Sequence, residues 1–406
     1  MNRDRGRFSV IASSMVLAAF STQEVEAQAP PVLPSTRVLQ AGPASLYPVI
    51  SLRNVGTDSN VYNDGVAPKE DFTYSITPKL FAVVPIGGTR FVGQAAGDFI
   101  YFQTYKDQQS ANGHFDVRYE VVDAKIRPFA TASFASHRER QGLEIDARVR
   151  QTQPALTLGT DFELTAKASL TGWGRRERIS WDESALYMGV PLAEQLNSTT
   201  DFLAAGARFR LTPLTSIITV AEIQRDRFET APERDADSVR LAPTVEFENG
   251  AAFSGQARVG YRIFRPLSPA LEAYRGLVAS AGLGYSIIDY TRVYADLGRD
   301  VKYSYDPLQP YYLESGLSFK VIQRIVGPFE AVAIGERWRL QHQRVGGTSF
   351  DGRQEDTTTV GGGVGFRISR EMELTFTAER TRRTSTEPVR RGYERRRVLA
   401  SISYGV

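Results

Sequence analysis

Apolar and polar residues alternate with period two at the C-terminal end of the chain. Between Val398 and Val406 the residues of one face are apolar or aromatic, with Tyr404 among them, whereas the opposite face includes Ser401 and Ser403. Side chains of a β-strand point alternately to its two faces, so this pattern predicts a strand with one apolar side. The chain therefore ends on a strand.

The same alternation recurs along most of the sequence. Phe115, Val117 and Tyr119, for example, alternate with charged residues, and no segment shows convincing helical periodicity. Many of the predicted strands exceed 13 residues, whereas strands of soluble proteins average about 5–6 residues. The pattern predicts eighteen strands, at about 47–56, 70–85, 89–105, 112–122, 125–138, 145–158, 161–180, 195–212, 215–229, 236–248, 251–265, 273–288, 292–305, 311–325, 328–344, 353–369, 371–384 and 393–406.

The connections between these strands alternate between short and long. Counted back from the C-terminus, short links such as Ser369–Glu371 and Asn249–Gly250 alternate with long ones such as Ser385–Gly392 and Trp181–Glu194. We place one further short link at Gly159–Thr160. Transmembrane barrels have short periplasmic turns, longer outer loops and an even number of strands. The pattern predicts an all-β, antiparallel, up-and-down transmembrane barrel of eighteen strands, or sixteen if 47–56 and a neighbour do not pair, closed by strands 47–56 and 393–406.

Composition agrees with a barrel and excludes several other classes of protein. The mean hydropathy is −0.28, and no apolar run after Ala29 approaches the about 20 residues of a membrane-spanning helix. The sequence has no cysteine, so disulfides and thiolate metal sites are excluded. With 49 basic and 46 acidic residues, the net charge of +3 does not suggest nucleic acid as a partner.

The N-terminus has the organisation of a secretory signal peptide. A stretch with three arginines precedes an apolar segment from Phe8 to Phe20, and Ala27-Gln28-Ala29 forms a small-residue cleavage site. We therefore predict a signal peptide at 1–29, a periplasmic leader at 30–46 and a barrel at 47–406, located in the bacterial outer membrane.

Two motifs resemble a known family. They read Leu52-Arg-Asn-Val-Gly-Thr-Asp58-Ser-Asn60-Val-Tyr62 and Gly298-Arg-Asp-Val-Lys-Tyr303-Ser-Tyr305-Asp, the latter followed by Pro310-Tyr-Tyr and Gly316. They are similar to motifs of the outer-membrane β-barrel porins, some of which accompany genes for exopolysaccharide synthesis and export. The resemblance implies a channel, and polysaccharide export components as partners. It supplies no catalytic residues.

Strand parity assigns a charged set to the lumen. An interior with many charges implies either a water-filled channel or a dense network of ion pairs sealed by loops. We expect a passive channel for polar solutes, with anionic solutes as one alternative, or for secreted polysaccharide. Lumen width and opposing charges would select the solute. The candidate pore-lining residues are Arg118, Lys167, Arg208, Arg210, Arg240, Arg258, Arg262, Asp296, Asp300, Lys302, Glu314, Arg337, Arg339 and Glu373.

Arginine is also frequent near the predicted outer ends of the strands. Parity directs Arg383, Arg395 and Arg397 inward, where they could guide an anionic solute. Guanidinium groups match phosphate in bidentate geometry, so outward arginines are candidates for contact with lipopolysaccharide, although a solvated run of loop charges is an equal alternative. The candidate lipopolysaccharide contacts are Arg176, Arg178, Arg380, Arg382 and Arg396. Other expected partners are outer-membrane lipid and the barrel-assembly machinery.

Two alternatives to a channel stay open at this point. One is a structural or adhesive envelope barrel with a closed pore. The other is an outer-membrane hydrolase, for which His137 beside Ser136, or His342 near the outer rim, would have to supply the base. Asp58 to Gly65 departs from the calcium-loop pattern and is interpreted as a turn. We expect no enzyme activity, no cofactor and no metal.

Overall fold

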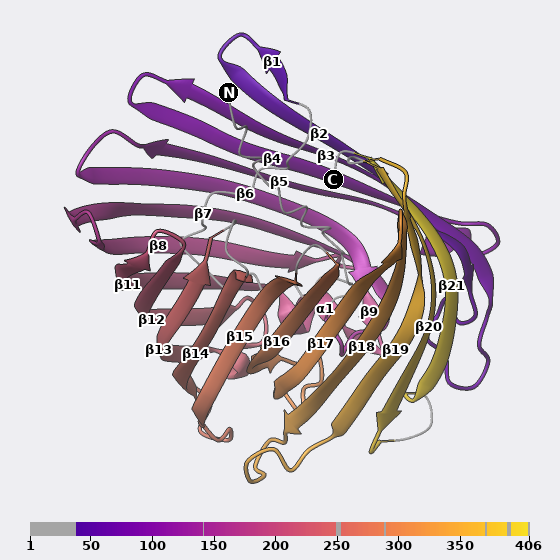
Figure 1. Cartoon of the computed structure of the whole chain (residues 1–406). Helices are drawn as coiled ribbons and strands as arrows, with labels where there is room; N and C mark the ends of the chain where they lie inside the picture. The colour runs from indigo at the N-terminus through magenta and orange to yellow at the C-terminus, as the bar shows by residue number, and fades with distance from the viewer. Residues whose placement is uncertain are drawn as a thin grey trace.

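The structure is a computed structural model that describes residues 38–140, 142–248, 253–287, 290–369, 372–387 and 391–404. Eighteen antiparallel strands form a closed barrel, and β2 pairs with both β3 and β21 (Figure 1). The predicted fold and strand count are confirmed. The barrel strands are β2 (Ala44–Asp58), β3 (Asp71–Ile86), β4 (Thr89–Phe102), β5 (Ser110–Val121), β6 (Ile126–Arg140), β7 (Arg148–Thr165), β8 (Ala168–Trp181), β11 (Ser198–Thr212), β12 (Thr215–Phe228), β13 (Ala236–Phe247), β14 (Phe253–Pro266), β15 (Tyr274–Ile287), β16 (Thr291–Tyr303), β17 (Tyr311–Val326), β18 (Phe329–Gln343), β19 (Gln354–Arg367), β20 (Met372–Ser385) and β21 (Tyr393–Tyr404).

Short elements decorate this barrel. β1 (Leu39–Ala41) pairs with the start of β2, and a hairpin of β9 (Leu186–Tyr187) and β10 (Val190–Pro191) leads into helix α1 (Leu192–Leu196) between β8 and β11. Single 3₁₀ turns, η1 (Lys106–Gln108) and η2 (Pro232–Arg234), lie in two other loops. Among the described residues, no helix is long and apolar enough to cross a membrane.

The seam between the first and last barrel strands closes as predicted. Ile50 pairs with Tyr404 and Leu52 pairs with Ile402, and the register then shifts by a bulge that contains Asn54, whose φ is +56°. Every edge strand would leave unpaired N–H and C=O groups in hydrocarbon, so closure satisfies the backbone. Gly405 and Val406 lie outside the described residues, as do the predicted signal peptide and part of the leader. The first described strand is β1, and β2 starts three residues before the predicted boundary.

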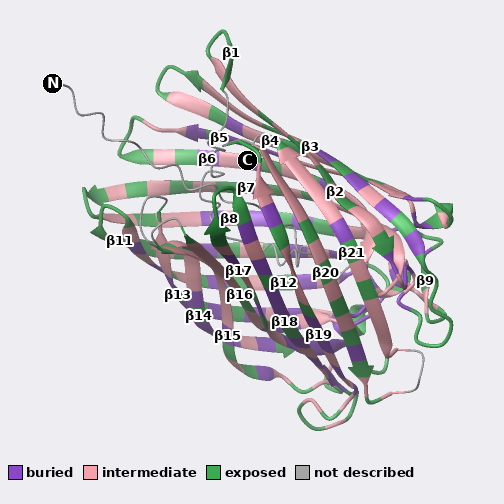
Figure 2. Ribbon diagram, turned by 45° about the vertical axis from the view of Figure 1, so that its right-hand side comes forward, coloured by how far each residue is buried: buried purple, intermediate pink, exposed green. Residues whose placement is uncertain are grey.

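The barrel reverses the distribution of side chains that a soluble protein has. Large apolar side chains such as Leu203, Leu277 and Val398 are more than 60% exposed, whereas Arg240 and Glu222 are almost fully buried. Buried and exposed residues alternate along the strands (Figure 2). Apolar side chains therefore cover the lipid face, and charged side chains fill the lumen.

The predicted turn at Gly159–Thr160 is wrong. β7 continues to Thr165 and β8 begins at Ala168, so the turn is formed by Ala166 and Lys167. Phe162 pairs with Leu170 across this two-residue turn, and cross-strand partners share a face. A register shift between Glu163 and Thr165 accompanies this turn and keeps the alternation of β7 and β8 in phase, so the period-two pattern could not locate the turn.

The phase of the closing strand makes a testable prediction. Tyr404 lies on the lipid face and is 42% exposed, whereas Ser403 lies on the inner face opposite Glu373. A lysine on the lipid face costs about 2–4 kcal/mol at the bilayer midplane and about 0–1 kcal/mol near the interfaces, so Tyr404→Lys should impair assembly more than Ser403→Lys. The measurement is the fraction of heat-modifiable barrel on cold electrophoresis. Equal tolerance of the two substitutions would contradict this phase.

Candidate functional site

The loop between β6 and β7 folds into the barrel instead of away from it. We call its described residues, 142–147, the inner loop. Its Glu144 is 2% exposed, and the carboxylate accepts hydrogen bonds from Ser304 Oγ at 2.6 Å and Arg353 Nη2 at 2.5 Å, while His342 Nε2 lies 3.0 Å away. In the strand order, β6 and β7 lie on the opposite side of the barrel from β18 and β19, which flank these partners. The inner loop therefore crosses the lumen.

A second carboxylate of the inner loop strengthens this attachment. Asp146 forms an ion pair with Arg383 of β20 and accepts a hydrogen bond from Asn63 Nδ2 at 2.9 Å. Arg383 also donates to Glu355 at 2.6 Å, and Arg353 Nε lies 3.0 Å from Glu355. We call this network the loop anchor. It consists of Glu144, Asp146, His342, Arg353, Glu355 and Arg383.

Electrostatics keeps the Glu144 carboxylate ionised. Burial alone would raise its pKa, but the His342, Arg353 and Ser304 groups outweigh burial and lower the pKa to about 2. Removing one partner of a buried ion pair costs about 3–5 kcal/mol, because the other charge stays buried without it. The anchor therefore holds the inner loop in one position at neutral pH.

Other outer loops pack against the inner loop. Arg234 of η2 is 1% exposed and donates to the carbonyl oxygens of Ser304, Tyr305 (3.3 Å) and Pro310 (3.2 Å) and to Gln195 Oε1 (2.9 Å). Burial lowers the pKa of Arg234 to about 10, which still leaves it charged at neutral pH. An apolar cluster completes the packing and contains Ile145, Trp181, Ala185, Leu192, Leu196, Phe228, Ala231 and Tyr305.

The second sequence motif has a structural role in this site. Ser304 and Tyr305 face the inner loop, Asp306 lies 3.3 Å from Arg353, and Tyr303 donates to Asp226 at 2.7 Å. Gly298 and Gly316 leave room for the Trp338 ring, which a Cβ at Gly316 would approach to within 2.4 Å. The motif therefore builds the surface on which the inner loop docks.

The first motif belongs to the barrel seam. Asp58 pairs with Arg395 (Nε–Oδ1 2.8 Å), and Asn60 donates to the backbone carbonyls of Asp64 and Glu394. Tyr62 donates to Asp107 of the neighbouring loop. These bonds tie the first outer loop to β21 and support the interpretation of this segment as a turn. Within the described ranges, no three His, Asp or Glu residues are placed to hold a metal ion.

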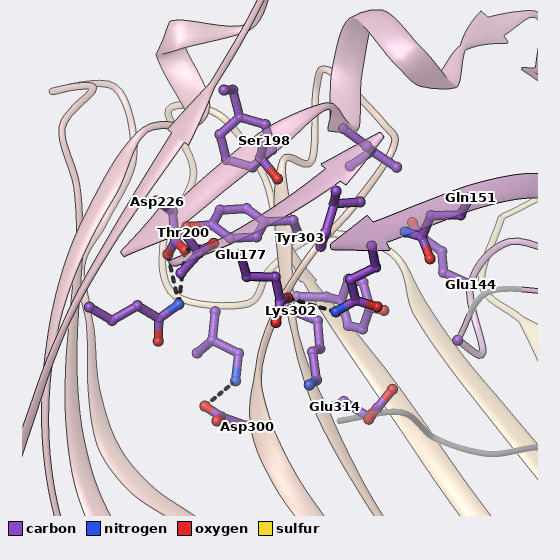
Figure 3. A pocket seen from close by; sticks show the side chains of 18 of the residues that line it. Glu144, Gln151, Glu177, Ser198, Thr200, Asp226, Asp300, Lys302, Tyr303 and Glu314 are labelled. Atoms are coloured by element: carbon purple, nitrogen blue, oxygen red, sulfur yellow. Dashed lines mark hydrogen bonds between the residues drawn. The ribbon is translucent and has the colours of Figure 1, made fainter. Parts of the chain in front are cut away.

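Below the loops, the lumen contains a cavity of about 290 Å³. Asp226, Asp300, Lys302 and Glu314 lie around it (Figure 3). Arg262 pairs with Asp300 at 2.8 Å, which fixes part of the wall. The charged residues of the lining are Glu144, Glu177, Asp226, Asp300 and Glu314 on the acidic side and Arg240, Arg262 and Lys302 on the basic side.

Most of the predicted pore-lining residues lie on the inner face. Arg240, Arg262, Asp300, Lys302 and Glu314 line the cavity itself. Five others lie on the inner face of their strands, together with cavity-lining residues or buried charges. These are Arg118, Arg208, Arg258, Asp296 and Glu373. Arg210 lies on the same face of β11 as Arg208, nearer the turn. Their part in conduction stays a prediction.

Three predicted pore-lining positions are wrong. Lys167 lies in the turn after β7, outside the barrel wall. Arg337 and Arg339 lie on the outer face of β18, with side chains 68% and 40% exposed, because Trp338 and Leu340 occupy the inner face. The Trp338 ring lies against Gly298 and Gly316 of the neighbouring strands and Leu340 is buried, so apolar residues face inward there and the usual polarity rule fails.

The five candidate lipopolysaccharide contacts all point outward. Arg176, Arg178, Arg380 and Arg396 have side chains 72%, 58%, 55% and 69% exposed, and Arg382 is also exposed. Arg383, Arg395 and Arg397 point inward, as parity predicted, and pair with Asp146, Asp58 and Glu379. Binding of lipid by the outward set stays a prediction.

The histidines considered for a hydrolase are placed differently from a catalytic triad. His342 is fully buried beside Glu144, and His114 contacts Asp116 at 2.5 Å. His137 and Ser136 are consecutive residues of one strand and point to opposite faces, and Ser136 accepts a hydrogen bond from Arg150. Their geometry does not join a serine to a histidine.

Sequence reasoning missed the loop anchor. Glu144 was placed at the end of a predicted loop, Asp146 and Arg353 were placed at the starts of the predicted strands 145–158 and 353–369, and His342 was considered only as a catalytic base. Interacting residues of the loop anchor lie up to about 240 residues apart in the sequence, as Arg383 and Glu144 do, so no local pattern marks them. The one available signal was the second motif, whose Ser304 and Tyr305 end the predicted strand 292–305 beside a predicted loop.

A family profile described as "Putative beta-barrel porin 2" matches residues 39–404. The chain belongs to this family. It is a porin-type β-barrel of the bacterial outer membrane, as predicted. No curated protein matches the sequence.

Solved porin structures have a comparable architecture. The outer membrane protein OpdK of Pseudomonas aeruginosa is 11% identical, with a TM-score of 0.48, over 88% of this chain and 98% of that chain. OccAB3 of Acinetobacter baumannii is 10% identical, with a TM-score of 0.49, over 88% of this chain and 99% of that chain.

The loop anchor predicts a specific pH dependence. The pKa of Glu144 lies near 2 in the docked loop, below its ordinary value of 4.5. The contribution of Glu144 to the stability of the docked loop is therefore present above about pH 4.5 and is lost as pH falls toward 2. Single-channel conductance should therefore be constant from neutral pH to about pH 5 and rise below it. Glu144→Gln should remove this step, because an amide does not titrate in that range. Glu183→Gln, at an exposed position of another loop, is the matched control. A step that persists in Glu144→Gln would exclude Glu144 as its origin.

Proposed function

We propose that this protein is a diffusion channel for small polar solutes whose width is set by the inner loop. The observation that carries the proposal is the attachment of Glu144 and Asp146 to the opposite wall. An eighteen-stranded barrel without such a loop would enclose a wide aqueous lumen. With the loop docked, the space beside it is a cavity of about 290 Å³, at the lower end of the range for small-ligand sites.

The charges of the cavity favour neutral or zwitterionic solutes over polyanions. Five carboxylates and three cationic groups line it, and several of them are already engaged, such as Asp300 with Arg262. Opposing charges at close range select solutes by hydrogen bonding and size rather than by net charge. We therefore prefer a solute of mono- to disaccharide size to the anionic solute considered from the sequence.

Export of exopolysaccharide is the finer function that the family resemblance suggested. A polymer strand would have to pass the position that the inner loop occupies, so export would require the loop anchor to open. The docked loop supports small-solute diffusion instead. Partnership with polysaccharide export components and with the barrel-assembly machinery stays a prediction, as does the cleaved signal peptide.

The experiment is a comparison of wild type and Glu144→Ala in planar bilayers and in liposome-swelling assays. Wild type should show discrete openings and admit glucose but exclude maltodextrins of several units. Glu144→Ala should raise conductance and the size limit, because loss of the carboxylate leaves Arg353 without its closest partner and releases the inner loop.

Glu183→Ala is the matched control and should behave as wild type. An absence of discrete openings in wild type at every voltage would contradict the channel and favour a closed structural barrel. Passage of maltodextrins through wild type would contradict the size limit set by the loop.

A further inference from the structure

The outer face of β18 to β21 carries a group of arginines near the outer ends of the strands. We call it the arginine patch, and it consists of Arg337, Arg339, Arg380, Arg382 and Arg396. Strand register brings its members together: Arg337 and Arg382 both pair with Thr358, and Arg380 pairs with Arg396. All five side chains are outside the lumen and between 40% and 69% exposed where measured.

The arginine patch has more positive than negative charge. Asp356 is shared by Arg337 at 3.8 Å and Arg339 at 2.9 Å, and Glu394 is shared by Arg380 at 2.7 Å and Arg396 at 2.9 Å. In the described part of the chain, no carboxylate lies within ion-pair distance of Arg382. Five guanidinium groups minus two carboxylates leave a net charge of +3.

The other outward arginines provide a contrast on the same barrel. Arg176 has its own carboxylate in Asp201 at 3.4 Å, and Arg178 has Glu229 at 2.7 Å. These two pairs are locally neutral. The excess charge is therefore a property of the arginine patch and not of every arginine at the outer rim.

Apolar residues adjoin the patch toward the middle of the membrane. Arg380 pairs in register with Val360, and the next outward residues of β20 and β21 are Ala378 and Val398, followed by Phe376. Val398 and Phe376 are 61% and 49% exposed. The guanidinium groups thus lie where hydrocarbon gives way to head groups, and an anionic partner there would balance the uncompensated charge.

We propose that the arginine patch binds the phosphate groups of the lipid A part of lipopolysaccharide. Guanidinium forks match phosphate oxygens in bidentate geometry, and each carboxylate already shared by two arginines leaves donors unused. The acyl chains of the same lipid would lie against Val398 and Phe376 below. Arg337 and Arg339, which parity had directed into the lumen, belong to this site.

The test compares a triple variant with a matched double variant. Arg337→Gln/Arg382→Gln/Arg396→Gln removes three of the five charges, and Arg176→Gln/Arg178→Gln removes two arginines that have their own carboxylates. Binding of bisphosphorylated lipid A to the detergent-solubilised barrel is measured by native mass spectrometry, with heat-modifiability and conductance as checks of folding. The triple variant should bind lipid A more weakly than wild type by a factor of about ten or more, because a single hydrogen bond to a charged group is worth about tenfold. The double variant should bind nearly as wild type does, because its two arginines have their own carboxylates.

Two further binding experiments identify the chemical group that the arginine patch recognises. Dephosphorylated lipid A should bind wild type about tenfold more weakly than the bisphosphorylated form, if phosphate is the group recognised. Millimolar inorganic phosphate should not displace bisphosphorylated lipid A, because free phosphate lacks the apolar contacts. The proposal is overturned if the triple variant binds as wild type does, if the double variant loses as much as the triple variant, if dephosphorylated lipid A binds equally, or if inorganic phosphate displaces the lipid.

Discussion

The pairing of every backbone N–H and C=O group is the constraint on which this structure depends. Hydrocarbon offers no partners, so a sheet inside it must close on itself. Here the closure joins β2 and β21, the first and last strands of the barrel, and a bulge at Asn54 adjusts the register where they meet. Side-chain interactions further stabilise this seam, including the Asp58–Arg395 ion pair.

Closure of the barrel also determines where the charged side chains lie. One face of each strand meets lipid and takes the apolar residues, so charged residues share the lumen and must find water or each other. Ion pairs such as Arg240–Glu222 and Arg262–Asp300 line its wall. The same physics draws the inner loop inward, because Glu144 and Asp146 find in the lumen the cations that the wall and the outer loops present. In the proposed channel, the inner loop and not the number of strands governs passage.

Sequence periodicity predicted the strands and their closure well, because each depends on local alternation. It failed in three places. Parity directed Arg337 and Arg339 inward, but Trp338 and Leu340 take the inner face, where the Trp338 ring lies against Gly298 and Gly316. The turn at Ala166 and Lys167 escaped because a register shift beside it keeps the alternation in phase. The loop anchor could not be predicted, since the partners of Glu144 follow it by 160 residues or more.

The positions of the anchor residues along the chain have a consequence for the folding of the protein. Glu144 lies in the first half of the sequence, whereas Ser304, His342 and Arg353 follow it by 160 residues or more. The inner loop can therefore dock only when both parts of the wall, β6 with β7 and β18 with β19, are folded. Docking of the loop is thus a late step of folding that depends on the wall as a whole.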